Sequence, residues 1–133
     1  GALVLAILAA GAGRSRHTLV ESDSRKAAFL AEVARRTGVT VEILGARIES
    51  AETPARVGPV DCVTARALAP LPRLVPWAAP YFGAGTVGLF LKGREVRAEL
   101  DEASRTWSFD YELLPSLTEA DSRIVRLQAL RQK

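Results

Sequence analysis

Charged side chains lie at the ends of most stretches whose composition favours β-strands. They are Glu21, Arg66, Lys92, Arg123 and the two charged residues of the segment 47–49, Arg47 and Glu49. In an open parallel sheet, ligands bind at the carboxyl ends of the strands. A carboxylate after the second strand can accept hydrogen bonds from both hydroxyls of an adenosine ribose, and arginine or lysine suits phosphate and carboxylate partners. By position alone, Glu21 is a ribose ligand or a helix-capping carboxylate, and each basic residue is an anion ligand or an ordinary surface charge.

Other kinds of chemistry find little support in the sequence. A single histidine, His17, and a single cysteine, Cys62, give no cysteine/histidine metal cluster and no internal disulfide. His17 has no serine nucleophile signature nearby, and neither glycine–lysine phosphate-binding signature is present. Residues 11–13 (Gly-Ala-Gly) are either a glycine turn beside a cofactor or a plain connecting loop. We interpret Cys62, Trp77 and Trp107 as packing residues.

Composition indicates a single globular domain. Of the 133 residues, 48% are hydrophobic and 25% are charged, which is enough apolar material for a core and argues against a disordered chain. A net charge of +3 suits a nucleic-acid partner and is also ordinary for a soluble domain. The longest apolar run covers about half a membrane span and lacks the basic leader of a signal peptide, so we expect a soluble cytoplasmic protein. Because the chain has no methionine and begins with glycine, we expect it to be a fragment.

The elements that must position these residues alternate between strands and helices. Residues 2–9 are either a buried strand or the end of a buried helix. Pro76 is expected to kink the helix predicted over 71–82 or to delay its start, because proline removes a helical hydrogen bond. The alternation predicts an α/β fold with a largely parallel sheet, closed by an antiparallel hairpin at one edge. We expect strands over 17–21, 40–44, 60–65, 86–91, 109–114 and 123–127, helices over 25–37, 71–82 and 94–105, and a loop over 51–59.

Five stretches of the chain together resemble one protein family. They are TLVESDSRKAAFLAEVARRTGV, ARIES, DCVTARALAPLPRLVPWAAPYF, LFLKGREVRAEL and ELLPSLTEADSRIVRL. Over nearly its whole length the chain is similar to the glucose-inhibited division protein B family, which methylates N7 of a guanine in 16S ribosomal RNA. The resemblance implies the Rossmann-like fold of class I methyltransferases, S-adenosylmethionine as cofactor, 16S rRNA or the small ribosomal subunit as partner, a monomer, and no metal.

The resemblance also implies roles for individual residues. Glu21 corresponds to the acid that holds the ribose of the cofactor, and Ile48 and Glu49 correspond to the pair beside its adenine ring. Arg66 corresponds to the arginine at the cofactor and substrate end of the site. Lys92 and Arg123, together with Arg66, are expected to face RNA. No catalytic base is expected, because guanine N7 carries a lone pair and alignment of the reacting atoms is sufficient.

The chain departs from the family pattern at its start. The family has a glycine-rich cofactor loop after its first strand, and Gly1 corresponds to the last glycine of that loop. Residues 2–10 are then the helix after the loop. We therefore expect residues 1–133 to be a methyltransferase domain fragment that lacks the N-terminal helices, the first strand and the glycine-rich loop. The alternatives are a non-catalytic RNA-binding domain on a methyltransferase-like scaffold and a methyltransferase of the same fold that acts on another substrate.

Overall fold

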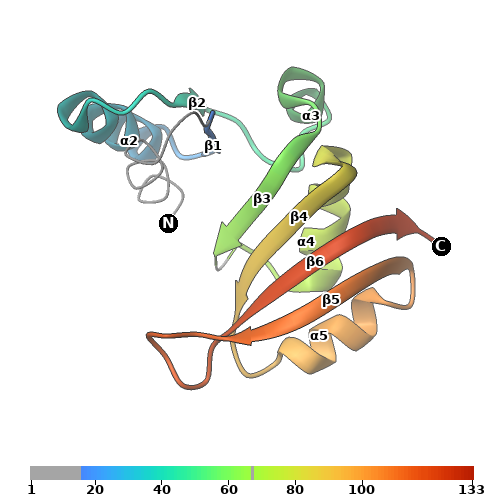
Figure 1. Cartoon of the computed structure of the whole chain (residues 1–133). Coiled ribbons are helices and arrows are strands. Elements are labelled where there is room, and N and C mark those ends of the chain that lie inside the picture. Colours follow the sequence, from blue (N-terminus) through green and yellow to red (C-terminus); the bar gives the residue numbers. More distant parts are fainter. Residues whose placement is uncertain (1–15, 67) are drawn as a thin grey trace. The chain divides into compact units, whose positions relative to one another are not determined.

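The computed structural model describes residues 16–66 and 68–133, which belong to two compact units (Figure 1). Unit 1 ends at Val57 and unit 2 covers Gly58–Lys133. The predictions for Gly1, for residues 2–10 and for the glycine turn at 11–13 lie outside the described residues.

Unit 1 is built on a strand–helix–strand motif. Strand β1 (Thr18–Val20) pairs in parallel with β2 (Glu42–Leu44), and helix α2 (Ser24–Thr37) connects them. The helix begins after Asp23, whose carboxylate accepts hydrogen bonds from the backbone N–H groups of Arg25 and Lys26 at 2.9 and 3.2 Å. It ends at Gly38, which adopts a φ of 71° that glycine tolerates best. The predicted helix, its polar cap and its glycine stop are confirmed.

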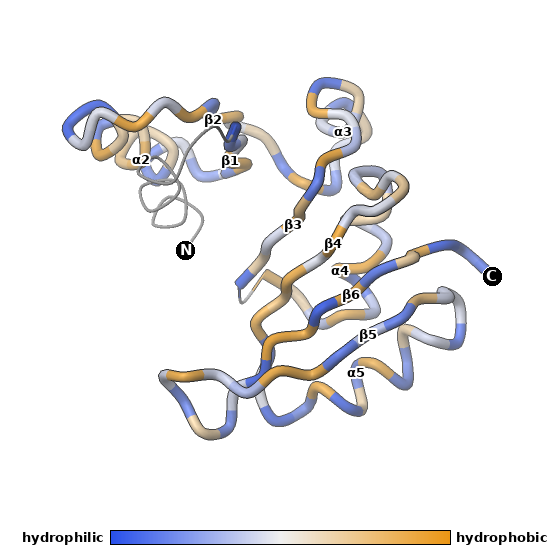
Figure 2. The backbone as a smooth tube through the Cα atoms, viewed as in Figure 1, coloured by the Kyte–Doolittle hydropathy of each residue, from blue (hydrophilic) through white to orange (hydrophobic). Residues whose placement is uncertain are grey.

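One face of α2 forms a small core with the two strands. Leu19 and Ala34 are buried there, with Leu30, Val33 and Ile43 packed against them. The colouring of α2 in Figure 2 alternates accordingly between hydrophobic and hydrophilic segments. On the outer face, Glu32 accepts hydrogen bonds from Arg35 and Arg36, and these cations lower the pKa of its carboxyl below the usual value. The face that is buried holds the strands in place, and the charged face remains in water.

A short helix occupies part of the segment predicted to be a loop. Helix α3 (Glu52–Val57) has an acidic residue in its first turn and Arg56 in its last, which suits the helix dipole. Pro54 lies near the start of the helix, where the missing N–H breaks no helical hydrogen bond. Thr53 is 1% exposed and its hydroxyl donates to the carbonyl oxygen of Arg47 at 2.9 Å. The loop prediction is therefore wrong over these six residues. Proline and polar residues are typical of loops, and a helix this short shows no periodic pattern that would distinguish it from one.

Unit 2 is a four-stranded sheet with helices. Its strand order is β3-β4-β6-β5, with β3 and β4 parallel and the other two pairs antiparallel. The predicted antiparallel hairpin at the edge, β5 and β6, is confirmed. The elements in chain order are β3 (Val60–Arg66), α4 (Leu71–Ala78), the 3-10 helix η1 (Ala79–Tyr81), β4 (Phe82–Lys92), α5 (Val96–Ala103), β5 (Trp107–Pro115) and β6 (Arg123–Gln132).

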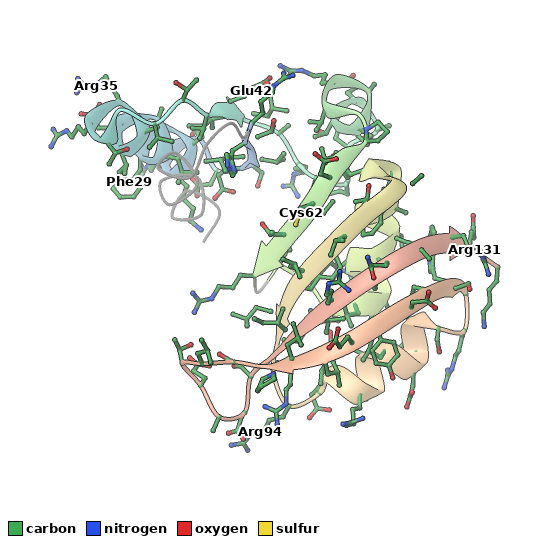
Figure 3. All side chains as sticks on the ribbon, in the orientation of Figure 1. Phe29, Arg35, Glu42, Cys62, Arg94 and Arg131 are labelled. Atoms are coloured by element: carbon green, nitrogen blue, oxygen red, sulfur yellow. The ribbon has the colours of Figure 1, made fainter. Side chains whose placement is uncertain are left out.

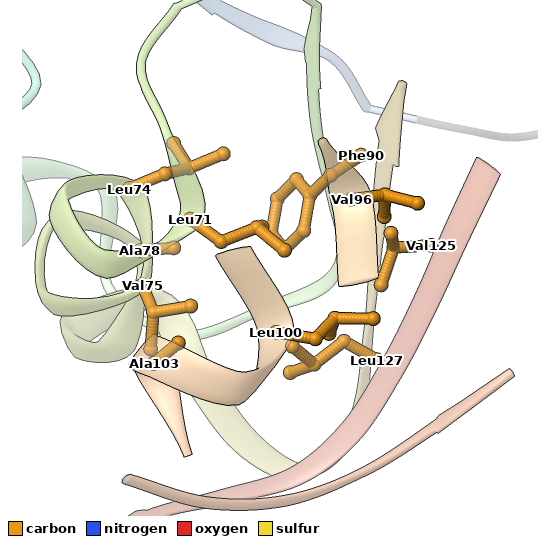
Figure 4. Packing of buried hydrophobic residues seen from close by; sticks show 10 residues of the cluster. All are labelled: Leu71, Leu74, Val75, Ala78, Phe90, Val96, Leu100, Ala103, Val125 and Leu127. Carbon is orange, nitrogen blue, oxygen red and sulfur yellow. The ribbon is translucent and has the colours of Figure 1, made fainter. Parts of the chain in front are cut away.

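Helices α4 and α5 pack together with β4 and β6 to form the main core (Figure 4). Phe90, Val125 and Leu127 project from the strands into this core with no exposed surface. Trp107 packs against it, as predicted. The C-terminal part of β4 is correspondingly hydrophobic in Figure 2. The buried members of the core are Leu71, Leu74, Val75, Ala78, Phe90, Val96, Leu100, Ala103, Val125 and Leu127.

The two helices of unit 2 are shorter than predicted. Helix α4 starts at Leu71 as expected, with Pro72 in its first turn, and it contains Pro76 without a delayed start. It ends at Ala78, and the chain continues through η1, because Pro80 has no N–H with which to extend the helical ladder. Phe82, predicted as helical, already belongs to β4. Helix α5 starts at Val96, later than the predicted residue 94.

Cys62 is exposed, so its interpretation as a core residue is wrong (Figure 3). Along β3, Val63 and Ala65 pack against the core, whereas Cys62, Thr64 and Arg66 are exposed. Successive strand residues point to opposite faces of a sheet, so Cys62 belongs to the face away from α4 and α5. Partial burial, with a smaller contribution from the Asp61 carboxylate, raises the pKa of the Cys62 thiol above its ordinary value.

We expect native Cys62 to be alkylated more slowly by iodoacetamide at about pH 8 than in the urea-unfolded chain, because the thiolate is the reactive form. A raised pKa reduces the thiolate fraction at every pH below it. The alkylation rate should therefore reach half of its maximum at a higher pH in the native chain than in the unfolded chain. Mass spectrometry can follow the reaction, since the sequence contains one cysteine. Asp61→Asn should move the midpoint downward. Equal midpoints for native and unfolded chains would contradict this expectation.

Candidate functional site

Glu21 lies directly after β1, and backbone hydrogen bonds fix its position. Its N–H donates to the carbonyl oxygen of Leu44 at 3.0 Å, and its own carbonyl oxygen accepts from the N–H of Ala46 at 3.1 Å. The ladder between β1 and β2 thus continues past the ends of both strands. Glu21 consequently lies at the carboxyl edge of a parallel pair, beside the segment that follows β2.

Ile48 and Glu49 lie in a turn that follows β2. The carbonyl oxygen of Arg47 accepts hydrogen bonds from the N–H of Ser50 at 3.1 Å and from the hydroxyl of Thr53 at 2.9 Å. The Arg47 guanidinium and the Glu49 carboxylate form an exposed ion pair at 3.4 Å. Ile48 is partly buried. The structure therefore brings Ile48 and Glu49 to the same edge of unit 1 as Glu21.

The three basic residues predicted from strand ends lie at one end of the sheet of unit 2. Arg66, the last residue of β3, is paired with Leu91, and Leu91 is paired with Ile124. Lys92 is paired with Arg123 in the next row of the same ladder. Arg66 is exposed and lines a cavity of about 300 Å³. These backbones are neighbours, but their side chains have different surroundings.

The side chain of Lys92 points inward, toward the helices. It is 9% exposed, and its ammonium lies 3.1 Å from the carboxylate Oε1 of Glu99, which is 17% exposed. The ammonium also donates to the carbonyl oxygen of Ala69. Glu99 Oε1 accepts from the N–H of Leu71 at 2.7 Å and so caps the first turn of α4, where Pro70 provides no side-chain cap. The ion pair thus fixes the backbone at Ala69 and Leu71, which lie shortly after the end of β3.

Arg123 braces the loop between β5 and β6, residues 116–122. Its Nη1 donates to the carbonyl oxygens of Ala120 and Ser122 at 2.8 and 2.9 Å. A second brace joins Arg94, which follows β4, to Asp121 at 2.7 Å. Sequence reasoning did not identify Glu99 or this loop as parts of the site. No local pattern marks Glu99, because its partner Leu71 is 28 positions away.

The described residues also bear on three other features: a metal site, a membrane span and the environment of Trp77. Within residues 16–66 and 68–133, no group of three or more histidine, cysteine, aspartate and glutamate side chains is arranged to hold a metal ion. In the same residues, none of the helices combines the length and the apolar character that a membrane span requires. Trp77 is partly buried and carries the Arg73 guanidinium 5.2 Å from the centre of its ring.

Comparison of the sequence with known proteins identifies one family. Residues 2–125 match the family model of rRNA small subunit methyltransferase G. The protein of that name from Methylorubrum populi is 52% identical over 130 residues, covering 96% of this chain and 60% of its own length. The protein from Methylobacterium nodulans is 46% identical over 135 residues, covering 98% of this chain and 63% of its own length. The chain thus spans about three fifths of the length of these curated relatives.

Comparison with solved structures identifies the fold. The ribosomal protein L11 methylase of Lactobacillus delbrueckii matches with a TM-score of 0.72 at 16% identity, covering 96% of this chain and 65% of its own. Fibrillarin from Aeropyrum pernix, solved with bound S-adenosyl-L-methionine, matches with a TM-score of 0.68 at 16% identity, covering 87% and 56%. The fold is therefore that of the class I methyltransferases, and the chain belongs to the rRNA small subunit methyltransferase G family.

Proposed function

We propose that the protein to which this chain contributes transfers a methyl group from S-adenosylmethionine to N7 of a guanine in 16S rRNA. The observation that carries the proposal is the family match over residues 2–125, together with a relative that is 52% identical over 130 residues. Residues 1–133 then form most of a methyltransferase domain. The proposed substrate is 16S rRNA, free or in the small ribosomal subunit, and the proposed state is a cytoplasmic monomer.

The carboxyl edge of unit 1 suits the adenosine part of the cofactor. A carboxylate fixed at a strand end accepts hydrogen bonds from ribose hydroxyls, and a partly buried aliphatic side chain packs against an adenine ring. We assign Glu21 to the ribose, and Ile48 and Glu49 to the adenine. Arg66 is assigned to the end of the site where cofactor and substrate meet.

The chemistry that S-adenosylmethionine supplies is an activated methyl group: N7 of guanine bonds to the methyl carbon while the carbon–sulfur bond breaks, its electron pair goes to sulfur, and guanine takes up the positive charge. No proton has to leave N7, so the residues of the chain need only bind and align the base. Arg66 and Arg123 supply cations for RNA phosphates. The role of Lys92 at RNA stays a prediction, and its inward contacts support an action through the segment that it holds.

Glu21→Ala is expected to weaken binding of S-adenosylmethionine by about 1–3 kcal/mol, the usual loss when a charged hydrogen-bonding partner is removed. Isothermal titration calorimetry of S-adenosylmethionine into the full-length enzyme measures the change in affinity. Glu42→Ala is the matched control, because Glu42 is an exposed glutamate at the opposite end of the same two-stranded sheet and should leave the affinity unchanged. Equal affinities for the two variants would remove Glu21 from the cofactor site.

The test of activity uses an enzyme of the relatives' full length, because this chain spans about three fifths of it. A suitable protein carries this chain and takes the remaining segment from the Methylorubrum populi relative; we call it the completed enzyme. It should methylate 16S rRNA or small subunits with labelled S-adenosylmethionine, and mapping should place the label on guanine N7. Salt-dependent RNA binding without cofactor binding or methylation would instead support the non-catalytic RNA-binding alternative.

A further inference from the structure

The cavity beside Arg66 is an open surface cavity lined by residues of unit 2. Its volume is about 300 Å³, and its walls come from two strands and from the loop between β5 and β6. Leu91 and Ile124, which are paired neighbours in β4 and β6, contribute apolar side chains. The loop adds Leu117, which is fully exposed. An opening of this kind accepts a flat, partly apolar ring on aliphatic side chains. The full set of lining residues is Arg66, Leu91, Ser116, Leu117, Thr118, Glu119, Ser122 and Ile124.

The loop that covers this cavity is held in a defined shape. The Ser116 hydroxyl oxygen accepts hydrogen bonds from the N–H groups of Thr118 and Glu119 at 3.3 and 3.4 Å. The Arg94–Asp121 pair at 2.7 Å and the contacts of Arg123 fasten the far side of the loop to the sheet. Figure 3 shows Arg94 next to this loop. The cavity wall is thus positioned before any ligand arrives, which lowers the entropic cost of binding.

Glu119 is one of the residues that line this cavity. Its Oε2 accepts a hydrogen bond from the hydroxyl of Ser122 at 2.8 Å, and Ser122 is 9% exposed. This contact orients the side chain of Glu119. A carboxylate has about four acceptor positions, so one contact leaves capacity for further donors. The cavity therefore combines apolar walls, an acceptor on the loop and a cation, Arg66, at the end of β3.

We propose that this cavity receives the target guanine and that Glu119 accepts hydrogen bonds from the N1–H and N2–H2 groups of the base. The inference rests on the proposed function, because it names the residue that reads the substrate of that same reaction. Guanine is the RNA base that offers two adjacent donors on its Watson–Crick edge, and a carboxylate matches that pair in spacing and charge. Adenine would place an acceptor, N1, against the carboxylate.

Recognition through this edge also leaves the reacting atom accessible. An arginine fork on guanine commonly binds O6 and N7 together, which would cover the methyl acceptor. Glu119 binds the opposite side of the base and leaves N7 uncovered. Methylation at N7 makes the base cationic, and a carboxylate at N1–H and N2–H2 is attracted more strongly to the charged product than to neutral guanine. Glu119 should therefore lower KM and raise kcat together.

The first experiment uses this 133-residue chain and measures binding. Guanosine, inosine and adenosine 5′-monophosphates are titrated and followed by NMR. Amide signals of residues 116–122 should shift with guanosine monophosphate, and several-fold higher concentrations of inosine monophosphate should be needed, because inosine lacks the N2 amino group. Glu119→Gln should remove this preference. Equal responses to the guanine and hypoxanthine nucleotides in the unmodified chain would overturn the proposal.

The second experiment uses the completed enzyme and measures turnover. Glu119→Gln should lower kcat/KM for 16S rRNA by about ten- to hundred-fold, the size expected for losing hydrogen bonds to a charged group, with affinity for S-adenosylmethionine unchanged. Glu102→Gln, an exposed glutamate of α5 outside the cavity lining, is the matched control and should change kcat/KM by less than about three-fold, as is usual for an exposed side chain.

Substrate variation separates recognition from a general structural defect. In a synthetic RNA, inosine at the target position should slow the unmodified enzyme about ten-fold and cause no further loss in Glu119→Gln, because both changes delete the same contact. Independent losses would overturn the assignment of Glu119. An unmodified completed enzyme that fails to methylate RNA would refute the proposed function, and the nucleotide titration would then decide on the cavity separately.

Discussion

Glu99→Ala is expected to lower the free energy of unfolding by about 3–5 kcal/mol, the usual cost of removing one partner of a buried ion pair. Two groups lose their partner together. The Lys92 side chain, which is 9% exposed, would lose its neighbouring carboxylate, and the N–H of Leu71 would lose its acceptor at the start of α4. Urea unfolding of the chain, followed by circular dichroism, measures the change.

Two further variants make this expectation specific. Glu102→Ala removes an exposed glutamate from the same helix and should cost less than about 0.5 kcal/mol. Lys92→Met combined with Glu99→Leu removes both charges and should recover much of the lost stability, since apolar pairs often replace buried ion pairs without loss. Similar losses of unfolding free energy in Glu99→Ala and Glu102→Ala would show that the Lys92–Glu99 pair stabilises the chain no more than an exposed glutamate does.

Leu127→Ala is expected to destabilise the chain by about 2–5 kcal/mol. Leu127 is fully buried in β6 and belongs to the core formed with α4, α5 and β4. Removing its side chain loses the transfer free energy of the missing methyl groups and leaves a cavity that the surrounding helices and strands fill only in part. The same urea titration applies, with the slope of the transition checked for a change in the denatured state.

Leu117→Ala provides the control with identical chemistry. Leu117 lies in the loop between β5 and β6 of the same unit and is fully exposed, so its removal should change stability by less than about 0.5 kcal/mol. A cost for Leu127→Ala no larger than that of Leu117→Ala would contradict the core as described.

The sequence predicts most elements because their signals are local. The serine–aspartate cluster before α2 and the glycine after it fix both ends of that helix, and the alternation of strands and helices predicts the parallel pairs. Helix α3 was not predicted, because a six-residue helix leaves no periodic pattern. The burial of Cys62 was wrongly predicted because both faces of β3 carry apolar residues, so composition does not reveal which face meets the helices.

For the candidate site too, the sequence predicts where residues lie along the chain but not which distant side chains they contact. Strand ends mark where Glu21, Arg66, Lys92 and Arg123 lie along the chain, and the structure places Glu21 at one sheet edge and the three basic residues at another. The direction of Lys92 follows from its phase: it is two residues from Phe90, so both side chains point to the helices. Its contact with Glu99 depends on how α5 packs, which no local pattern of residues encodes.

The order of strands in unit 2 has a consequence for how the protein acquires its structure during synthesis. Strand β6 lies between β4 and β5, although it follows both in the chain. A ribosome therefore releases β5 before the strand that pairs with it exists, and the edge of β4 waits for the same partner. Exposed strand edges invite pairing with other chains. We expect the sheet to close only after β6 has emerged, so chaperone binding to nascent chains should fall at that point.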